Sequence, residues 1–324
     1  MKSSNLMRLS LGVMLAGLVG LAGCDNGTSN TPLVDRTAVG KDKIYKGELL
    51  VLCDGGLEPI LKQQVDVFEF VYDSVNVDIA YRTEGDVLQE FRKRKSGVAV
   101  LSRAMDKAEK DDFIKRDTLH IREMPVAYDA VAMIGNVKFD DSKLTLDGLK
   151  GLFDPRNIDS KTRMVFEDKN SSTVNYVLGK LGYTNKVSSN VNALNSVDEV
   201  IAYVEKNTEA IGFIPYSFIS DADDEKVQAV LKRIKILSLH TVNKEGEKVR
   251  VSANQSDIAD GSYPLIRTIN VMSRFTYSDD LEWLFMNFLY KEKGARIFLK
   301  AGLIPIRAPE REINVNTGDM KFDN

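Results

Sequence analysis

The chain has 324 residues, 43% of them hydrophobic and 28% charged, and a formal net charge of -3. This length is enough for one large domain or two smaller lobes. A nucleic-acid-binding surface needs positive charge, so we expect no nucleic-acid partner. The two cysteines and the two histidines, His120 and His240, have a spacing that fits neither a metal site nor a disulfide framework. We therefore expect no metal and no cofactor.

The N-terminus has the pattern of a secretory signal. Lys2 and Arg8 precede an apolar run that ends Leu21-Ala22-Gly23-Cys24 and is too short to span a bilayer. This ending resembles the lipobox of bacterial lipoproteins, which implies cleavage before Cys24 and a lipid on its sulfur. The alternative is an uncleaved anchor with a chance cysteine. We expect residues 1–23 to be a lipoprotein signal peptide, and residues 24–44 to be a flexible tether to a bacterial membrane.

Three strand–loop–helix patterns follow the tether. Apolar or alternating runs at residues 49–53, 75–81 and 98–101 are each followed by polar residues and then by a helical pattern. Consecutive units of this kind predict a parallel sheet covered by helices. Ligands bind such sheets at the carboxyl ends of the strands, so the loops after these strands should meet.

A fourth loop, Glu167 to Thr173, has the strongest anion-binding character. It lies between a strand pattern at residues 163–166 and a helical pattern. The first turn of a helix exposes backbone N–H groups and the positive end of the macrodipole. The hydroxyls of Ser171, Ser172 and Thr173 can donate to a bound oxyanion. The alternative is that they are ordinary helix caps.

Arg103 is the most informative charge in the chain. Its guanidinium can meet an oxyanion with two parallel N–H donors, and Ser102 beside it adds a hydroxyl. The alternative is that Arg103 pairs with a helix carboxylate such as Glu109.

Several segments resemble, in order along the chain, the motifs of phosphate-binding proteins of ABC transporters. In the first half, Val98–Arg103 resembles the Ser-Arg loop of that family, Tyr128–Asn136 its Asp-Gly-Ile-Ala strand, and Leu144–Phe153 its helix before the second-lobe loop. In the second half, Asn170–Thr173 resembles its Gly-Ser-Gly-Thr loop, Ala210–Phe213 its Ile-Gly-Tyr strand, and Lys300–Pro305 its closing Gly-Tyr-Val-Pro segment. Each segment is weak evidence, whereas their common order is fairly specific.

The resemblance implies an α/β fold of the type II periplasmic-binding-protein class. Such a fold has two lobes, each with a parallel or mixed sheet covered by helices, and two crossover strands join the lobes. Lobe 1 would comprise residues 45–126 and 274–313, lobe 2 with the crossover strands residues 127–273, and the C-terminal tail residues 314–324. The crossovers would lie at residues 127–134 and 263–272, and a broad apolar stripe at residues 279–300 predicts one core helix.

The resemblance also implies a ligand and partners. The expected ligand is inorganic phosphate or a related oxyanion, which a monomeric protein in the periplasm or at the cell surface delivers to the permease subunits of an ABC transporter. The ligand would be held in the cleft between the lobes. The residues implied to contact it are Gly56, Leu57, Thr83, Glu84, Ser102, Arg103, Ser171, Ser172 and Thr173.

The chain departs from the family pattern in three places. Glu167 stands where the family has an arginine, Ser172 replaces a glycine, and Gly56-Leu57 stands where a threonine often donates. Near neutral pH phosphate keeps a proton that sulfate lacks, so a carboxylate in the cleft would favour phosphate. Glu84 is the first candidate for that carboxylate and Asp54 the second. The alternative is that each only complements the dipole at a helix start.

Three other functions are weighed against phosphate binding. The first is a binder or sensor of the same fold for another oxyanion or small ligand, which Glu167 favours. The second is a secreted hydrolase. Ser171 and Ser172 have no histidine near them in sequence, and the motifs of common hydrolases are absent, so we expect no enzymatic activity. The third is a lipoprotein that has lost its ligand and makes only protein contacts.

Overall fold

The computed structural model describes residues 45–117, 121–157, 160–184, 186–243, 246–274, 277 and 280–309. The predicted signal peptide, Cys24, the tether, His120 and the C-terminal tail lie outside these residues. Among the residues that are described, no helix is long and apolar enough to cross a membrane.

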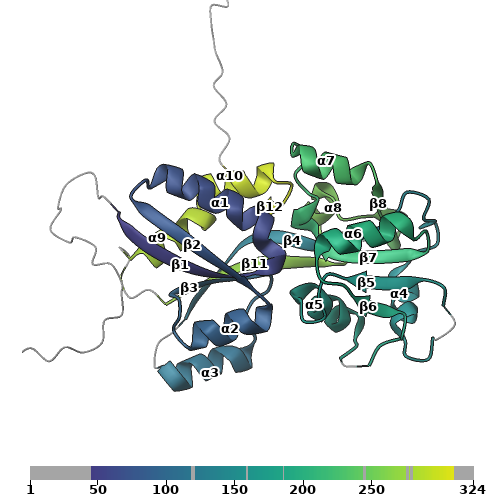
Figure 1. The fold of residues 1–324 in the computed structure, drawn as a ribbon, viewed down its shortest axis with the longest axis horizontal. Helices are drawn as coiled ribbons and strands as arrows, with labels where there is room; N and C mark the ends of the chain where they lie inside the picture. Colours follow the sequence, from purple (N-terminus) through teal and green to yellow (C-terminus); the bar gives the residue numbers. More distant parts are fainter. Residues whose placement is uncertain are drawn as a thin grey trace, which may run out of the picture. The chain divides into compact units, whose positions relative to one another are not determined.

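A continuous path of hydrogen-bonded strands runs through the described chain in the order β2-β1-β3-β11-β4-β7-β5-β6 (Figure 1). At one end of the path, β1 pairs in parallel with β2 and β3. At the other end, β5 pairs in parallel with β6 and β7. These six strands are Gly47–Asp54 (β1), Val75–Arg82 (β2), Val98–Leu101 (β3), Arg163–Phe166 (β5), Val191–Ala193 (β6) and Ala210–Pro215 (β7).

Two antiparallel strands, β4 (Arg122–Asn136) and β11 (Ile266–Ser273), join the two ends of the path. The first part of β4 pairs with β11, and its last part, from Val131, pairs with β7. The predicted crossover at residues 127–134 lies within β4, and the one at residues 263–272 overlaps β11. Short strands complete the sheets: Ile234–Ile236 (β8) and Ile304–Pro305 (β12) pair with β4, and Leu239–Val242 (β9) pairs with Lys248–Val251 (β10).

Helices cover both faces of the sheet. In Figure 1, α1, α9 and α10 lie on one side of β1–β3, and α2 and α3 lie on the other. Around β5–β7, α6 lies on one side and α4 and α5 on the other. The helices are Glu58–Val71 (α1), Glu84–Arg92 (α2), Lys107–Asp117 (α3), Leu146–Phe153 (α4), Ser172–Leu181 (α5), Val197–Lys206 (α6), Glu225–Leu231 (α7), Gln255–Ala259 (α8), Leu281–Tyr290 (α9) and Glu292–Lys300 (α10), with single 3-10 turns at Gly55–Leu57 (η1) and Tyr216–Phe218 (η2).

The strands are apolar on both faces because both faces are covered. Val51 and Cys53 of β1 pack into the main core cluster, whereas Leu52 points to the other face and packs in a second cluster under α2 and α3. Phe91 and Phe113 belong to that second cluster and pack edge to face, with their ring centroids 5.7 Å apart. This alternation follows from the two-residue period of a strand. It explains why the strands look like continuous apolar runs in the sequence.

The predicted single helix at residues 279–300 is wrong. Two helices, α9 and α10, meet at Lys291, whose backbone is extended. Gly294 in α10 lies so close to the end of α9 that a Cβ there would be 2.3 Å from the carbonyl oxygen of Phe288. A broad apolar stripe fits two short helices that pack on each other as well as one long helix, so the stripe alone could not locate the break.

We predict that Gly212→Ala destabilises the protein. A Cβ at Gly212 in β7 would be 2.7 Å from Val200 Cγ1 and 2.9 Å from Ile134 Cγ1. Overpacking of this kind costs about 1–3 kcal/mol. Gly151→Ala in α4 is the matched control, because nothing lies within 4 Å of a Cβ there and alanine favours a helix by about 0.5–1 kcal/mol. Urea unfolding measures both variants, and equal stability of the two would contradict the packing described here.

Candidate functional site

The loops after β1 and β5, far apart in the sequence, meet at Gly56. A Cβ at Gly56 would be 3.4 Å from Ser172 Oγ and 3.2 Å from Pro215 Cγ. Ser217 in η2 donates a hydrogen bond to the Gly56 carbonyl oxygen at 3.2 Å. Glycine suits this position because it lets two backbones approach closely. Two of the loops that the sequence predicts to bind ligand are therefore in contact.

Asp54 joins the first loop to the loop after β3. Ser102 Oγ donates to Asp54 Oδ2 at 2.7 Å, and the backbone N–H of Gly56 donates to Asp54 Oδ1 at 3.2 Å. Only 2% of Asp54 is exposed. This buried carboxylate thus fixes the positions of two predicted ligand-binding residues.

Arg103 adopts the alternative in which it pairs with carboxylates. Its Nη1 and Nη2 donate to the two oxygens of Glu109 at 2.8 Å each, and its Nε donates to Glu84 Oε1 at 2.7 Å. The hydrogen bond from Arg103 lowers the pKa of Glu109. Burial raises the pKa of Glu84, and Arg103 only partly offsets this effect. Most of the donor capacity of Arg103 is therefore already used by protein groups.

The buried cation nearest the hydroxyl loop is Arg267 on β11, which the sequence analysis missed. Arg267 Nε donates to Asp129 Oδ2 at 2.9 Å, and Nη1 donates to Ser172 Oγ at 3.2 Å. Both charged side chains are almost completely buried. Burial opposes the charge of Arg267, but Asp129 and then Asp54 raise the pKa of Arg267 above its ordinary value. Arg267 therefore stays protonated.

The register of the sheet explains this ion pair. Arg267 and Asp129 are direct partners across β11 and β4, although they are 138 residues apart in the sequence. An arginine in an alternating strand normally faces solvent, so the pattern alone does not reveal its burial. The available signal was one charged residue in each of the two predicted crossover strands.

The three hydroxyls of the loop before α5 have different partners. Ser171 caps the helix by accepting from the backbone N–H of Val174 at 3.2 Å, whereas Ser172 bonds Arg267. Thr173 is fully buried, and its hydroxyl has no hydrogen bond of good geometry to the described residues. Ser171 is thus a helix cap, whereas donation from these hydroxyls to an oxyanion stays a prediction.

Glu167 is buried beside this loop. It is 8% exposed, and neither carboxylate oxygen has a hydrogen bond of good geometry to the described residues. Burial raises the pKa of Glu167 to about 7, while the nearby hydroxyls of Thr173 and Ser171 and the charge of Arg267 act in the opposite direction. Glu167 is therefore a carboxyl group that changes its charge near neutral pH.

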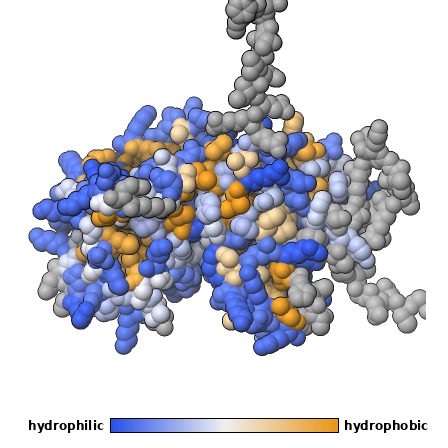
Figure 2. Space-filling model, turned by 180° about the vertical axis from the view of Figure 1, so that it is seen from behind, coloured by the Kyte–Doolittle hydropathy of each residue, from blue (hydrophilic) through white to orange (hydrophobic). Residues whose placement is uncertain are grey.

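Seven of the nine predicted contact residues line two pockets. One pocket, of about 440 Å³, is lined by Glu84, Ser102, Arg103 and Ser172 together with residues of α5. The other, of about 220 Å³, is lined by Asp54, Gly56, Thr83, Glu167 and Ser171, among others. Of the remaining two residues, Leu57 packs in the core and Thr173 is buried. Both α2 and α5, labelled in Figure 1, contribute residues to the lining of the first pocket. Figure 2, which views the surface from behind, shows a notch in its lower edge.

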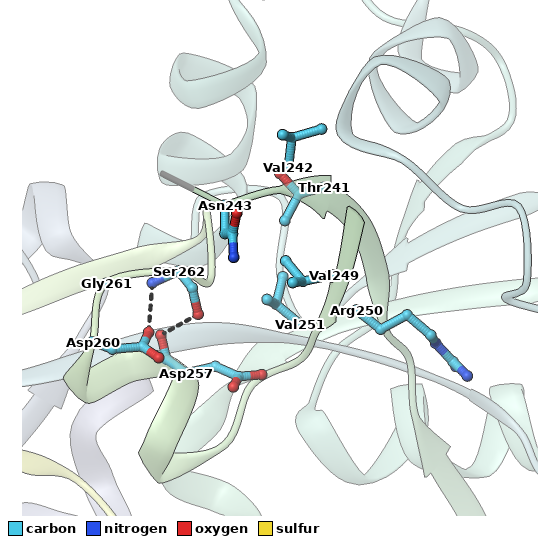
Figure 3. Close-up of a pocket in the computed structure, with 10 residues that line it drawn as sticks. All are labelled: Thr241, Val242, Asn243, Val249, Arg250, Val251, Asp257, Asp260, Gly261 and Ser262. Carbon is cyan, nitrogen blue, oxygen red and sulfur yellow. Dashed lines mark hydrogen bonds between the residues drawn. The ribbon is translucent and has the colours of Figure 1, made fainter. Parts of the chain in front are cut away.

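A larger hollow, of about 590 Å³, lies between the β9–β10 hairpin and α8 (Figure 3). Its polar groups bond one another: the Ser262 backbone N–H donates to Asp260 Oδ1 at 2.8 Å, and Ser262 Oγ donates to the carbonyl oxygen of Asp257. Figure 3 shows Arg250 directed away from these groups, and its Nη2 lies 3.3 Å from Asp141 Oδ1. This hollow gathers none of the predicted site residues, so we place the candidate site at the loops around Gly56.

The two shared strands and the loops that meet from both ends of the sheet path define a two-lobed solute-binding fold. The chain belongs to the family described as "PBP superfamily domain", whose model matches residues 35–293. A comparison with curated protein sequences gives no match.

Solved structures have the same fold at low sequence identity. A Clostridium perfringens protein assigned as a phosphate ABC transporter substrate-binding protein, with bound phosphate, is 18% identical with a TM-score of 0.63, covering 81% of this chain and 100% of that one. An ABC-type phosphate transport receptor from Vibrio cholerae is 18% identical with a TM-score of 0.60, covering 79% and 99%. PstS from Borrelia burgdorferi is 16% identical with a TM-score of 0.53, covering 82% and 100%. These likenesses confirm the predicted fold class.

We predict that Glu167→Gln stabilises the protein at alkaline pH. The pKa of Glu167 in the folded state, about 7, exceeds its ordinary value of 4.5. The stability that the protonated group provides is complete below the ordinary value and is lost as the pH rises to about 7. Ionisation at higher pH therefore costs on the order of 3 kcal/mol. Glutamine stays neutral, so the variant should exceed the wild type in stability by an amount of this order at pH 8.

Urea unfolding at pH 5 and pH 8 checks this prediction. Asp168→Asn is the matched control, because Asp168 is the next residue but is partly exposed. The stability difference between the wild type and Asp168→Asn should change little between the two pH values, because both keep Glu167. A stability difference between wild type and Glu167→Gln that does not grow with pH would contradict the assignment.

Proposed function

We propose that this chain is an extracytoplasmic solute-binding protein that binds phosphate between its two lobes and delivers it to the permease of an ABC transporter. The observation that carries the proposal is the buried guanidinium of Arg267, which bonds Ser172 at the start of α5 and lies beside the Gly56 loop. A fixed arginine at a helix N-terminus is suited to a tetrahedral oxyanion.

The donors around Arg267 fit an oxyanion. Arg267 Nη2 lies 2.9 Å from Asp129 Oδ2, although without hydrogen-bond geometry, and it would be 3.6 Å from a Cβ at Gly56. Nη2 carries two N–H groups, so we propose that one serves the ion pair with Asp129 and the other donates to a ligand beside the first loop. The hydroxyl of Ser172, at the start of α5, lies near the same point, 3.4 Å from a Cβ at Gly56.

The energy of such a site is sufficient for binding. Each hydrogen bond to a charged group contributes roughly 1.5–3 kcal/mol, so seven or eight of them give on the order of 10–20 kcal/mol. Micromolar affinity needs about 8 kcal/mol. The remainder is offset by the desolvation of the dianion and the closure of the lobes. The proposed contacts are Gly56, Leu57 through its backbone, Thr83, Glu84, Ser102, Arg103, Ser171, Ser172 and Thr173, to which we add Arg267.

Two carboxylates are candidates for the group that selects phosphate over sulfate. Glu84 lines the pocket of about 440 Å³, but its Oε1 is bonded by Arg103 Nε at 2.7 Å. Asp54 lines the pocket of about 220 Å³ and bonds Ser102. A carboxylate that accepts the proton of phosphate repels sulfate, which has no such proton. We propose that one of these two groups has this role.

The cellular location that we propose is based on the N-terminal sequence. The lipobox-like ending at Cys24 supports a lipid anchor in a bacterial membrane, with the binding protein in the periplasm or at the cell surface. In this proposal the protein is a monomer and has no enzymatic activity.

A second candidate function is the binding of another oxyanion or small ligand by the same fold. The observation that favours it is the excess of acid: Asp54, Asp129, Glu84 and Glu167 lie around two arginines, of which Arg103 is already paired with carboxylates. This charge balance favours a ligand of lower negative charge than the phosphate dianion.

We predict that Arg267→Lys weakens phosphate binding by roughly 10- to 100-fold. Lysine keeps the positive charge but cannot bond Asp129, Ser172 and the ligand at the same time, so one charge-assisted hydrogen bond is lost. Calorimetric titration with phosphate measures the effect. Arg250→Lys is the control, since Arg250 also pairs with a carboxylate but lies at the hollow beside the hairpin. Unchanged affinity of Arg267→Lys would remove Arg267 from the site.

We also predict that either Glu84→Gln or Asp54→Asn relaxes the discrimination against sulfate. Loss of the acceptor charge removes the repulsion of sulfate and the bond to the phosphate proton. Titration of both variants with phosphate, arsenate and sulfate identifies the responsible group. If the wild type binds sulfate as tightly as phosphate, the protein is a more general oxyanion binder, and if it binds none of the three anions, the second candidate function is favoured.

A further inference from the structure

The carboxyl group of Glu167 is a feature of the candidate site to which the proposed hydrogen bonds to phosphate give no role. Glu167 is a buried carboxyl group without a hydrogen bond of good geometry, and it lines the same pocket as Asp54, Gly56 and Ser171. The hydroxyl of Thr173, beside it in the first turn of α5, is also buried without such a bond. An ionised carboxylate in this position is only partly compensated, because the cost of burial outweighs the nearby hydroxyls and the charge of Arg267.

The location of Glu167 matters because of what it faces. The first turn of α5 offers its positive end, and Arg267 offers its charge, both to Glu167 and to any anion bound at Ser172. Two negative groups would therefore share one set of positive groups. Bringing a second like charge close to Glu167 favours its neutral form.

We propose that the bound anion and the negative charge of Glu167 exclude each other, so that anion binding at this site requires a protonated Glu167. The inference rests on the proposed function, since it concerns the same anion. Glu167 is a positioning residue: it acts through the potential at the start of α5 and does not contact the ligand.

The other charges near Glu167 support this assignment. Asp168 follows it in the chain, and Asp54 faces the same pocket from the end of β1. Neither carboxyl group offers Glu167 a positive partner. From β11, Arg267 is the positive group whose charge lowers the pKa of Glu167 against the effect of burial, and Lys169 lies exposed two residues along the chain.

The end of β2 contributes two more titratable groups to the pocket lining. Burial raises the pKa of Tyr81, so this side chain is neutral near pH 7. Arg82 is directed to its own neighbours: its Nη1 donates to the Tyr81 carbonyl oxygen at 2.7 Å and its Nε to Glu90 at 3.4 Å. The remaining elements contribute the uncharged Val197 and Phe218.

The size of the effect follows from the fraction of protein that can bind. With a pKa of about 7, the protonated fraction of Glu167 falls from about nine-tenths at pH 6 to about one-tenth at pH 8. The apparent dissociation constant rises in inverse proportion to the competent fraction, which gives about a tenfold change. Phosphate itself also loses a proton over this range, so the effect of Glu167 must be measured as a ratio between proteins.

The experiment is calorimetric titration of wild type, Glu167→Gln and Asp168→Asn with inorganic phosphate at pH 6 and pH 8. Glutamine mimics the protonated carboxyl group, and the titration of phosphate cancels when two proteins are compared. We expect the dissociation constant of the wild type to rise about tenfold more than that of Glu167→Gln between the two pH values. Asp168→Asn should follow the wild type.

A second measurement uses the heat of binding at pH 7 in two buffers of different ionisation enthalpy. The wild type should take up about half a proton more per phosphate than Glu167→Gln, because Glu167 is half ionised before binding and neutral after it. Glu167→Met is the second neutral variant, to be used if Glu167→Gln does not fold.

The outcomes separate the two proposals. If phosphate binds and the pH dependence and proton uptake are the same in wild type and in the neutral variants, this inference is overturned and the proposed function stands. If phosphate binds to the wild type at neither pH, both are overturned. If Asp168→Asn loses the pH dependence as Glu167→Gln does, general surface charge is the cause and the inference is again overturned.

Discussion

The arrangement of the site depends on the buried ion pair between Arg267 and Asp129. Two charges removed from water remain stable only when they satisfy each other, and loss of one partner costs about 3–5 kcal/mol. Because the two residues face each other across β11 and β4, the pair forms only when these strands adopt the observed register. The same guanidinium bonds Ser172, so the start of α5 is tied to the strands that connect the two ends of the sheet path. The register of β11 against β4, the position of α5 and the location of the positive charge at the site are thus set together by this one ion pair.

The charges around this pair are distributed unevenly. Arg103 is neutralised by Glu84 and Glu109, so its attraction for an anion is small. The positive potential at the site comes instead from Arg267 and from the N–H groups at the start of α5. A ligand there must compete with nearby carboxylates for few positive groups. Such a site should respond strongly to the protonation state of each acid.

Local patterns predicted the elements well and the side-chain partners poorly. The strands at residues 163–166 and 98–101 have the predicted bounds, because their apolar runs end at polar loops. Arg103 had two open alternatives, since the sequence cannot decide between a ligand and a carboxylate for the same fork of donors. Arg267 was missed because its partner is fixed by the pairing of distant strands. Information of that kind is absent from any short window of sequence.

The acid at position 167 is physically consistent with this pairing. The resemblance leads us to expect an arginine there, whereas the structure supplies the buried guanidinium from Arg267 on β11, within electrostatic range of Glu167. A second arginine in the same space would face like-charge repulsion from Arg267. With the cation supplied by another strand, an acid at position 167 is tolerated provided that it can become neutral. Its burial provides that condition near pH 7.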